Sequence, residues 1–295
     1  MKKRQDPMEP EELRANYERS LDALFEKDRL SQFGRVVKGL IHNINGPLQN
    51  LSMLVEMLSK GQDQLDGLAL SRPEGFSEKW EGVSSKQRQR FQRLTQQISL
   101  LAGILRDFMV LLDIERNQSR VDLNLIIEKM ASVFQADLFF KHDVEMDLQL
   151  ERGLPLASIH GRDIIPALMH LFQNAITALR EAPQKKLTIE CLRESEEFIR
   201  IVFRDSGCGP GAEPSVGDRC DLFYSNWPET VIIHEHGEKH FGFGLYAVRQ
   251  LLGPYGVEFR LERDLQVTEA ILKIPIQPRK LLAVEPFEAA EQFLP

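Results

Sequence analysis

Apolar residues in the first part of the chain recur every three or four positions, which predicts long amphipathic helices. One run extends from Leu30 to Leu58 and a second from Phe91 to Leu112, both close to a heptad repeat. Residues 9–29 continue the helical pattern upstream of the first run.

The segment between the two runs, residues 61–79, is rich in Gly, Pro, Ser and Asp and predicts a loop. We therefore predict an antiparallel helical hairpin over residues 1–118. Its long, narrow seams favour a homodimeric four-helix bundle over a monomeric hairpin packed on the rest of the chain.

Beyond residue 118 the pattern changes to strands and shorter helices. Strand-like segments are expected at 142–151, 185–194, 197–207, 257–264 and 269–276, and helices at 121–135, 164–182 and 242–256. This mixture predicts an α/β sandwich over residues 119–280, followed by a short tail over residues 281–295. The predicted fold class of the whole chain is α+β.

Composition narrows the possible partners and surroundings. The chain has 295 residues, of which 42% are hydrophobic, enough for two domains. A net charge of -7 gives no electrostatic reason to expect nucleic acid, and no apolar run is long enough for membrane insertion. The 3 cysteines lack metal-type spacing, and a cytoplasmic location is the natural expectation.

The segment GLIHNINGPLQNL, residues 39–51, carries a histidine in the middle of the first helical run. His42 is two positions from Leu40, about 200° around a helix, so its imidazole is expected to point away from the seam. Pro47 lacks an N–H and Gly46 loosens the same turn, so a bend is expected just after His42. An exposed neutral imidazole is a competent nucleophile, but from this segment alone a solvated surface histidine without a role is the favoured interpretation, which the Gly-Pro pair changes only slightly.

Three further stretches suggest a nucleotide site. Asn174, in the apolar helix HLFQNAITAL, is either a Mg²⁺ ligand or a buried structural amide. Asp205 ends a strand before Gly207 and Gly209, where the acid can accept a hydrogen bond from the exocyclic amine of adenine, although a simple turn has the same pattern.

The third stretch is KHFGFGLYAVRQLL, residues 239–252. Gly242 and Gly244 precede an amphipathic helix whose first N–H groups could bind phosphate. Gly-x-Gly before a helix is common, and the third glycine of the dinucleotide-binding pattern is absent.

In this order, the four motifs resemble those of two-component sensor histidine kinases, with the histidine segment closest to the nitrogen-regulation type. The resemblance covers about residues 30–278 and implies a phosphoacceptor hairpin joined to an ATP-binding domain of the gyrase, Hsp90, histidine kinase and MutL superfamily, the Bergerat fold. By resemblance, His42 accepts phosphate from ATP, Asn174 holds Mg²⁺ and Asp205 binds adenine. The glycines Gly207, Gly209, Gly242 and Gly244, with Leu245 after them, complete the cofactor site. The phosphoryl group would pass to an aspartate in the receiver domain of a separate response regulator.

The sequence departs from the family pattern at three positions. Asn43 replaces the acid that usually follows the phosphoacceptor histidine and acts as a base, so slow autophosphorylation is expected. Gly46 replaces a polar residue that positions water, which puts phosphatase activity in doubt. His170 stands where many relatives have the first asparagine of the asparagine box.

The segment between the glycine motifs corresponds to the ATP lid of the family, with Leu222 and Phe223 matching only part of the usual sequence. His234, His236 and His240 in this segment permit a zinc site, but a solvated lid is the simpler explanation.

Three functions are compatible with these residues. The leading hypothesis is an ATP-dependent protein histidine kinase. The second is a degenerate, non-catalytic, nucleotide-binding dimeric scaffold that sequesters a regulator or partner kinase. Another ATPase of the superfamily is the third, and the histidine-bearing hairpin argues against it.

Overall fold

The computed structural model describes residues 10–135, 138–180, 182–207, 242–264 and 267–277, without the side chains of residues 10, 13, 32, 33, 35, 36, 38–43, 45, 138, 139 and 141. The helices are α1 (Pro10–Ser71), α2 (Phe76–Asn117), α3 (Leu123–Phe134), α4 (Leu138–Asp143), α5 (Gly161–Arg180), α7 (Gly244–Leu252) and the short 3₁₀ helix η1 (Gly253–Tyr255). The strands are β1 (Glu145–Leu150), β2 (Lys186–Arg193), β3 (Phe198–Asp205), β4 (Glu258–Asp264) and β5 (Val267–Pro275). The predicted α+β class is confirmed.

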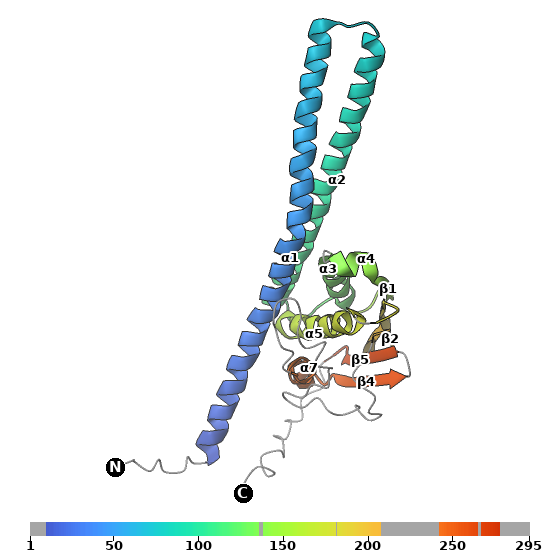
Figure 1. Cartoon of the computed structure of the whole chain (residues 1–295). Helices are drawn as coiled ribbons and strands as arrows, with labels where there is room; N and C mark the ends of the chain where they lie inside the picture. Colours follow the sequence, from blue (N-terminus) through green and yellow to red (C-terminus); the bar gives the residue numbers. More distant parts are fainter. Residues whose placement is uncertain (1–9, 136–137, 181, 208–241, 265–266, 278–295) are drawn as a thin grey trace, which may run out of the picture.

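Helices α1 and α2 form a long antiparallel hairpin that projects from the sheet-containing part (Figure 1). The loop expected over residues 61–79 is wrong, because α1 continues to Ser71 and α2 already begins at Phe76. Interhelical packing overrides the weak helix propensity of this segment. Gly61, for example, leaves room for Gln87, which donates a hydrogen bond to the carbonyl of Leu58 at 2.8 Å.

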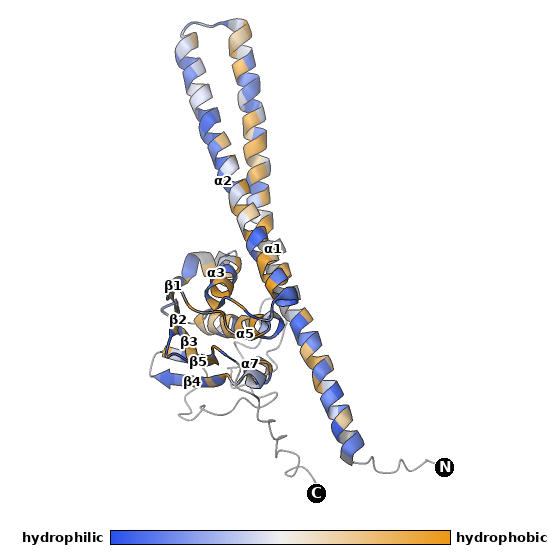
Figure 2. Cartoon of the chain, turned by 180° about the vertical axis from the view of Figure 1, so that it is seen from behind, coloured by the Kyte–Doolittle hydropathy of each residue, from blue (hydrophilic) through white to orange (hydrophobic). Residues whose placement is uncertain are grey.

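The apolar seam positions of the hairpin form two sets, one buried or half-buried and the other exposed. Figure 2 shows hydrophobic residues recurring along both helices. Phe108 is buried, and Leu94 and Leu101, the seam positions before it, are half-buried. The alternate seam positions, each seven residues from the next, are exposed: Leu48 and Val55 on α1, and Phe91, Ile98 and Leu105 on α2.

The sheet is mixed and has the order β1-β2-β3-β5-β4, with β1 and β2 parallel and the other pairs antiparallel. All five predicted strands are present. On its polar face Arg204 bonds Glu190 at 2.7 Å and Glu269 at 2.5 Å, across both neighbouring strands. Helices α5 and α7 lie between α1 and the sheet in both Figure 1 and Figure 2.

The two parts of the chain share a close backbone contact. A side chain at Gly161, the first residue of α5, would place its Cβ 2.0 Å from the carbonyl oxygen of Ile114 near the end of α2. Helix α3 begins at an N-cap, where the Asp122 carboxylate accepts a hydrogen bond from the backbone N–H of Leu125 at 3.1 Å. These two features fix where α3 and α5 begin relative to the end of α2.

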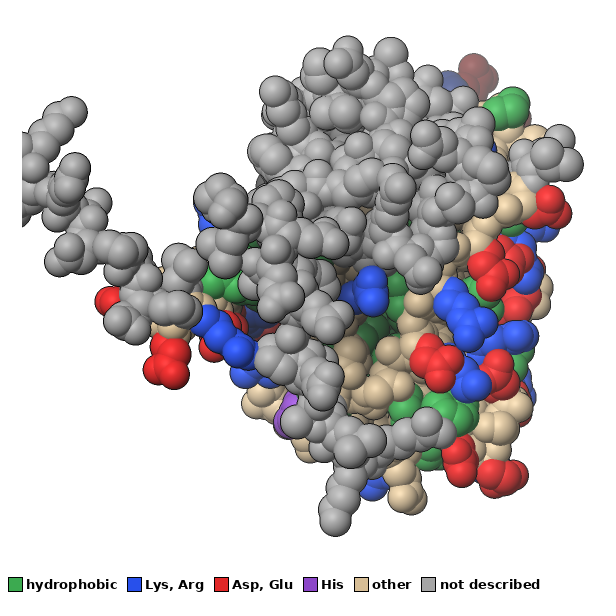
Figure 3. Space-filling view, turned by 90° about the horizontal axis from the view of Figure 1, so that it is seen from below, with side chains coloured by type: hydrophobic (Ala, Val, Ile, Leu, Met, Phe, Trp, Pro, Cys, Tyr) green, Lys and Arg blue, Asp and Glu red, His purple; other side chains and the backbone are tan. Residues whose placement is uncertain are grey.

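Helix α1 runs unbroken past Gly46 and Pro47. Among the described residues, no helix combines the length and the apolar character needed to cross a membrane. Figure 3 shows that the described acidic and basic side chains are interspersed on the face seen from below.

Candidate functional site

Asp205, the last residue of β3, is a buried carboxyl group with only 7% of its surface exposed. Burial raises its pKa from 3.8 to about 6, although the backbone N–H of Gly207 and the charge of Arg263 act in the opposite direction. The Gly207 N–H donates to Oδ1 at 2.9 Å. Within the described part of the chain, Oδ2 has no hydrogen-bond donor, so it is suited to accept one from a ligand.

Gly207 brings the turn after β3 against α5. A Cβ at this position would lie 2.4 Å from the Cβ of Ala178 and 2.7 Å from Oδ1 of Asp205, so any side chain would displace the turn. Ala178 follows Asn174 by one helical turn on α5, and residues four apart share a helix face. The turn after β3 and Asn174 therefore lie along the same side of α5.

Gly244 begins α7 and also lies against α5. A Cβ built on it would be 3.1 Å from Nδ1 of His170 and 3.7 Å from Nδ2 of Asn174. Gly242, two residues earlier, adopts a positive φ of 65° that favours glycine. Among the described residues no side chain caps the start of α7, so its first N–H groups are available to an anion.

The sequence motifs thus lie close together around one helix, α5. Asn174, half-buried on α5, lies between the turn that carries Asp205 and the start of α7. Its amide oxygen is a ligand of the kind Mg²⁺ accepts. Leu245 is half-buried and packs on the core of the domain. The residues that the sequence assigned to adenine, metal and phosphate are therefore neighbours in space, except Gly209, which lies outside the described residues.

Asp28 is a part of this region that sequence reasoning missed. It comes from α1, and its Oδ2 lies 2.8 Å from Nε2 of His170. The side chains are 15% and 6% exposed. The pair is separated by 142 residues in sequence, and no local pattern marks an acid on an exposed helix as a partner of α5.

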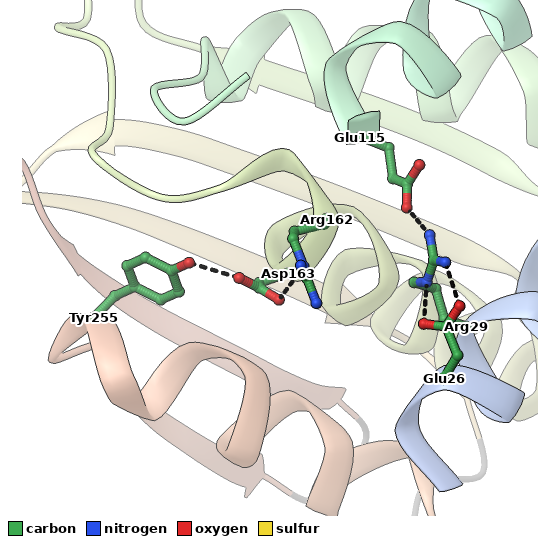
Figure 4. Close-up of polar contacts among 6 residues, drawn as sticks. All are labelled: Glu26, Arg29, Glu115, Arg162, Asp163 and Tyr255. Carbon is green, nitrogen blue, oxygen red and sulfur yellow. Dashed lines mark hydrogen bonds and ion pairs between the residues drawn. The ribbon is translucent and has the colours of Figure 1, made fainter. Parts of the chain in front are cut away.

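Aromatic side chains complete the contact between α1 and the site, and a neighbouring ion pair ties α1 to α2. Phe25 packs on Phe243, directly before α7, with ring centroids 5.4 Å apart, and stacks on Tyr246 at 6.1 Å. Arg29 pairs with Glu26 on its own helix and with buried Glu115 of α2 (Figure 4).

At the other end of α5, the Tyr255 hydroxyl donates to the Asp163 carboxylate at 2.5 Å, which ties η1 to the first turn of α5 (Figure 4).

Several predicted residues lie outside the described part of the structure. His42 and Asn43 belong to α1, but their side chains are not described. The expected outward orientation of the imidazole therefore stays a prediction. Leu222, Phe223 and the three lid histidines, His234, His236 and His240, are also outside the described residues. Among the residues that are described, no cluster of three or more His, Cys, Asp or Glu could hold a metal.

Comparison with known proteins gives no match among family models or curated proteins. Solved structures similar to this chain include a mycobacterial sensor histidine kinase, MprB, at 16% identity and a TM-score of 0.43, covering 54% of this chain and 98% of that one. The catalytic domain of the histidine kinase ThkA gives 20% identity, a TM-score of 0.44 and coverage of 54% and 97%. The Acinetobacter baumannii histidine kinase AdeS gives 18%, 0.40, and coverage of 74% and 96%. These similarities are too distant to carry a functional argument, which depends instead on the residues of this chain.

Proposed function

We propose that this chain is an ATP-dependent protein histidine kinase that autophosphorylates His42 and passes the phosphoryl group to an aspartate of a separate response regulator. The observation that carries the proposal is the meeting of three motifs on one side of α5: Asp205 with Gly207, Asn174, and the uncapped start of α7. Each offers the chemistry that one part of Mg-ATP requires.

Each group has a defined task toward the nucleotide. Oδ2 of Asp205 accepts a hydrogen bond from the exocyclic amine of adenine, while Gly207 lets the backbone approach the flat base. The first N–H groups of α7 hold the phosphates. Asn174 would hold Mg²⁺, which when bound neutralises charge on the transferring phosphoryl group.

In the reaction, an imidazole nitrogen of His42 forms a bond to the γ-phosphorus as the bond to the bridging oxygen breaks and ADP leaves. The imidazole proton must go to a base. The Asn43 amide cannot accept it, so a slow reaction is expected.

The exposed half of the hairpin seam supports a homodimer. Leu48, Val55, Phe91, Ile98 and Leu105 form a heptad-spaced stripe on α1 and α2 that the hairpin itself leaves open. A second copy, adding its own hairpin, would cover this stripe in a four-helix bundle.

The degenerate-scaffold alternative is favoured by Asn43 and Gly46, which replace both helper residues around His42. Such a scaffold would bind nucleotide and dimerise without becoming phosphorylated. Nucleotide binding and phosphorylation must therefore be measured separately.

The test is incubation of the full chain with Mg²⁺ and γ-labelled ATP. We expect an acid-labile, base-stable phosphate that His42→Gln abolishes. His142→Gln is the matched control, because His142 is an exposed histidine on α4. Labelling that persists in His42→Gln would rule out His42 as the acceptor. Nucleotide binding without any labelling of the unchanged protein would favour the scaffold.

A further inference from the structure

The contact between Asp28 and His170 joins two elements that the domain division would separate. Asp28 lies in the N-terminal part of α1, and His170 lies in the middle of α5. Their 2.8 Å contact is largely shielded from solvent. A carboxylate and an imidazole largely held out of water form a charge-assisted hydrogen bond, and removing the carboxylate takes this acceptor away from the ring.

His170 faces the nucleotide site on its other side. Its Nδ1 lies 3.1 Å from the position of a Cβ on Gly244, and its ring meets the edge of Phe243 with centroids 6.3 Å apart. The same Cβ position is 3.7 Å from Nδ2 of Asn174. The imidazole thus packs against the start of α7 and lies one helical turn before Asn174.

A carboxylate on one ring nitrogen fixes the orientation of the imidazole. An ionised carboxylate only accepts hydrogen bonds, so Nε2 of His170 carries a proton in this contact and Nδ1 is turned toward α7. Rotation of the ring would disturb its packing against Gly244 and Phe243, which begin α7. The place of the α7 N–H groups relative to Asn174 therefore depends on Asp28.

We propose that Asp28 is a positioning residue of the nucleotide site, acting through His170. It makes the N-terminal part of α1 a component of that site, so that a change in this part of α1 alters the affinity for Mg-nucleotide. The inference rests on the proposed nucleotide-binding function and adds to it a residue from outside the ATP-binding domain.

The neighbouring ion pair supplies a matched control. Arg29, the next residue on α1, binds Glu115 of α2 and Glu26 of its own helix (Figure 4). None of these three contacts Asn174, Gly244 or Asp205 in the described structure. Arg29→Gln therefore loosens the packing of this part of α1, by breaking its ion pair with α2, without touching the site. Asp22→Asn, at an exposed position on the same helix, controls for loss of charge.

The experiment measures the dissociation constant of an unreactive ATP analogue, with Mg²⁺, for the full chain and its variants. We expect Asp28→Asn to weaken binding about tenfold, the lower end of the loss found when the carboxylate partner of a metal-ligating histidine is removed. Arg29→Gln and Asp22→Asn should bind as the unchanged chain does. In a His170→Asn background, Asp28→Asn should have no further effect.

If Asp28→Asn and Arg29→Gln weaken nucleotide binding equally, the Asp28–His170 contact acts only by holding α1 in place, and the inference is overturned. Nucleotide binding by Asp28→Asn equal to that of the unchanged chain would also overturn it. If that variant does not fold, Asp28→Glu, which keeps the charge but moves it, must show the loss instead. Failure of the unchanged chain to bind the nucleotide would overturn the proposed function and this inference with it.

Discussion

Replacing Asp205 by asparagine should make the protein more stable while weakening nucleotide binding. The carboxyl group is 7% exposed, and its burial raises the pKa from 3.8 to about 6. Asparagine has nearly the same shape and still offers an oxygen to the Gly207 N–H. The substitution thus removes the charge and leaves the turn in place.

The size of the effect follows from the pKa. Because the folded protein holds the Asp205 proton more tightly than the unfolded chain, it binds more protons between pH 4 and 6, and stability falls as pH rises through that range. Above the folded pKa the full cost applies, about 3 kcal/mol for a pKa raised from 3.8 to about 6. Asp205→Asn should recover about 3 kcal/mol at pH 8 and about half of that at pH 5.

The assay is urea unfolding of the full chain at both pH values, with Asp143→Asn, an exposed acid on α4, as control. The same variant presents an amide N–H to the adenine amine where the carboxylate accepted a hydrogen bond. Affinity for the ATP analogue should fall about 10- to 100-fold, the value of a hydrogen bond to a charged group. A loss of stability at pH 8, or a gain independent of pH, would refute the reasoning about burial.

Three further experiments test the proton acceptor beside His42, the close packing at Gly161 and the burial of Cys191. Asn43→Glu restores an acid beside His42 and should raise the rate of autophosphorylation, by up to about 10²- to 10⁴-fold if the missing base limits it, as followed by labelling kinetics. Gly161→Ala places a Cβ 2.0 Å from the backbone oxygen of Ile114 and should cost about 1–3 kcal/mol in urea unfolding. The Cys191 thiol, whose pKa burial raises to about 12, should resist iodoacetamide at pH 8 until the protein is unfolded, as read by peptide mass.

Each of these has an outcome that contradicts it. An unchanged labelling rate in Asn43→Glu would mean that another group takes the proton. Gly103→Ala, a helical glycine with nothing within 4 Å of its Cβ position, should instead stabilise by about 0.5–1 kcal/mol, and equal effects at both glycines would remove the steric explanation. Rapid alkylation of Cys191 in the native protein would show that its surroundings open.

Periodicity predicted most of the fold, because helices and strands place side chains on faces at different intervals. The helix 164–182 and the strand 197–207 both form, as α5 and β3, within a few residues of their predicted bounds. The loop prediction for residues 61–79 was wrong because Gly, Ser and Asp lower helix propensity by only a small amount at each position, which the packing of the two helices outweighs. The contact of its glycine with Gln87 of α2 became apparent only in the structure.

The sequence predicted those site residues that interrupt a regular pattern. Asp205 and Gly207 are an example, because an acid and then a glycine come at the end of an apolar strand. Asp28 gives no such signal, because acids on an exposed helix are common. Its role arises from the way α1 packs on α5, which the heptad seam around it does not specify.

Two features of the site lower the stability of the protein without ligand. Asp205 is buried at a cost to stability, and among the described residues no side chain caps the first N–H groups of α7. Both features border the same stretch of α5. A nucleotide that accepts the N–H hydrogen bonds and donates to Asp205 would relieve both costs at once. Its binding should therefore stabilise the folded chain, and the gain should shrink in Asp28→Asn if α1 helps to hold the site in place.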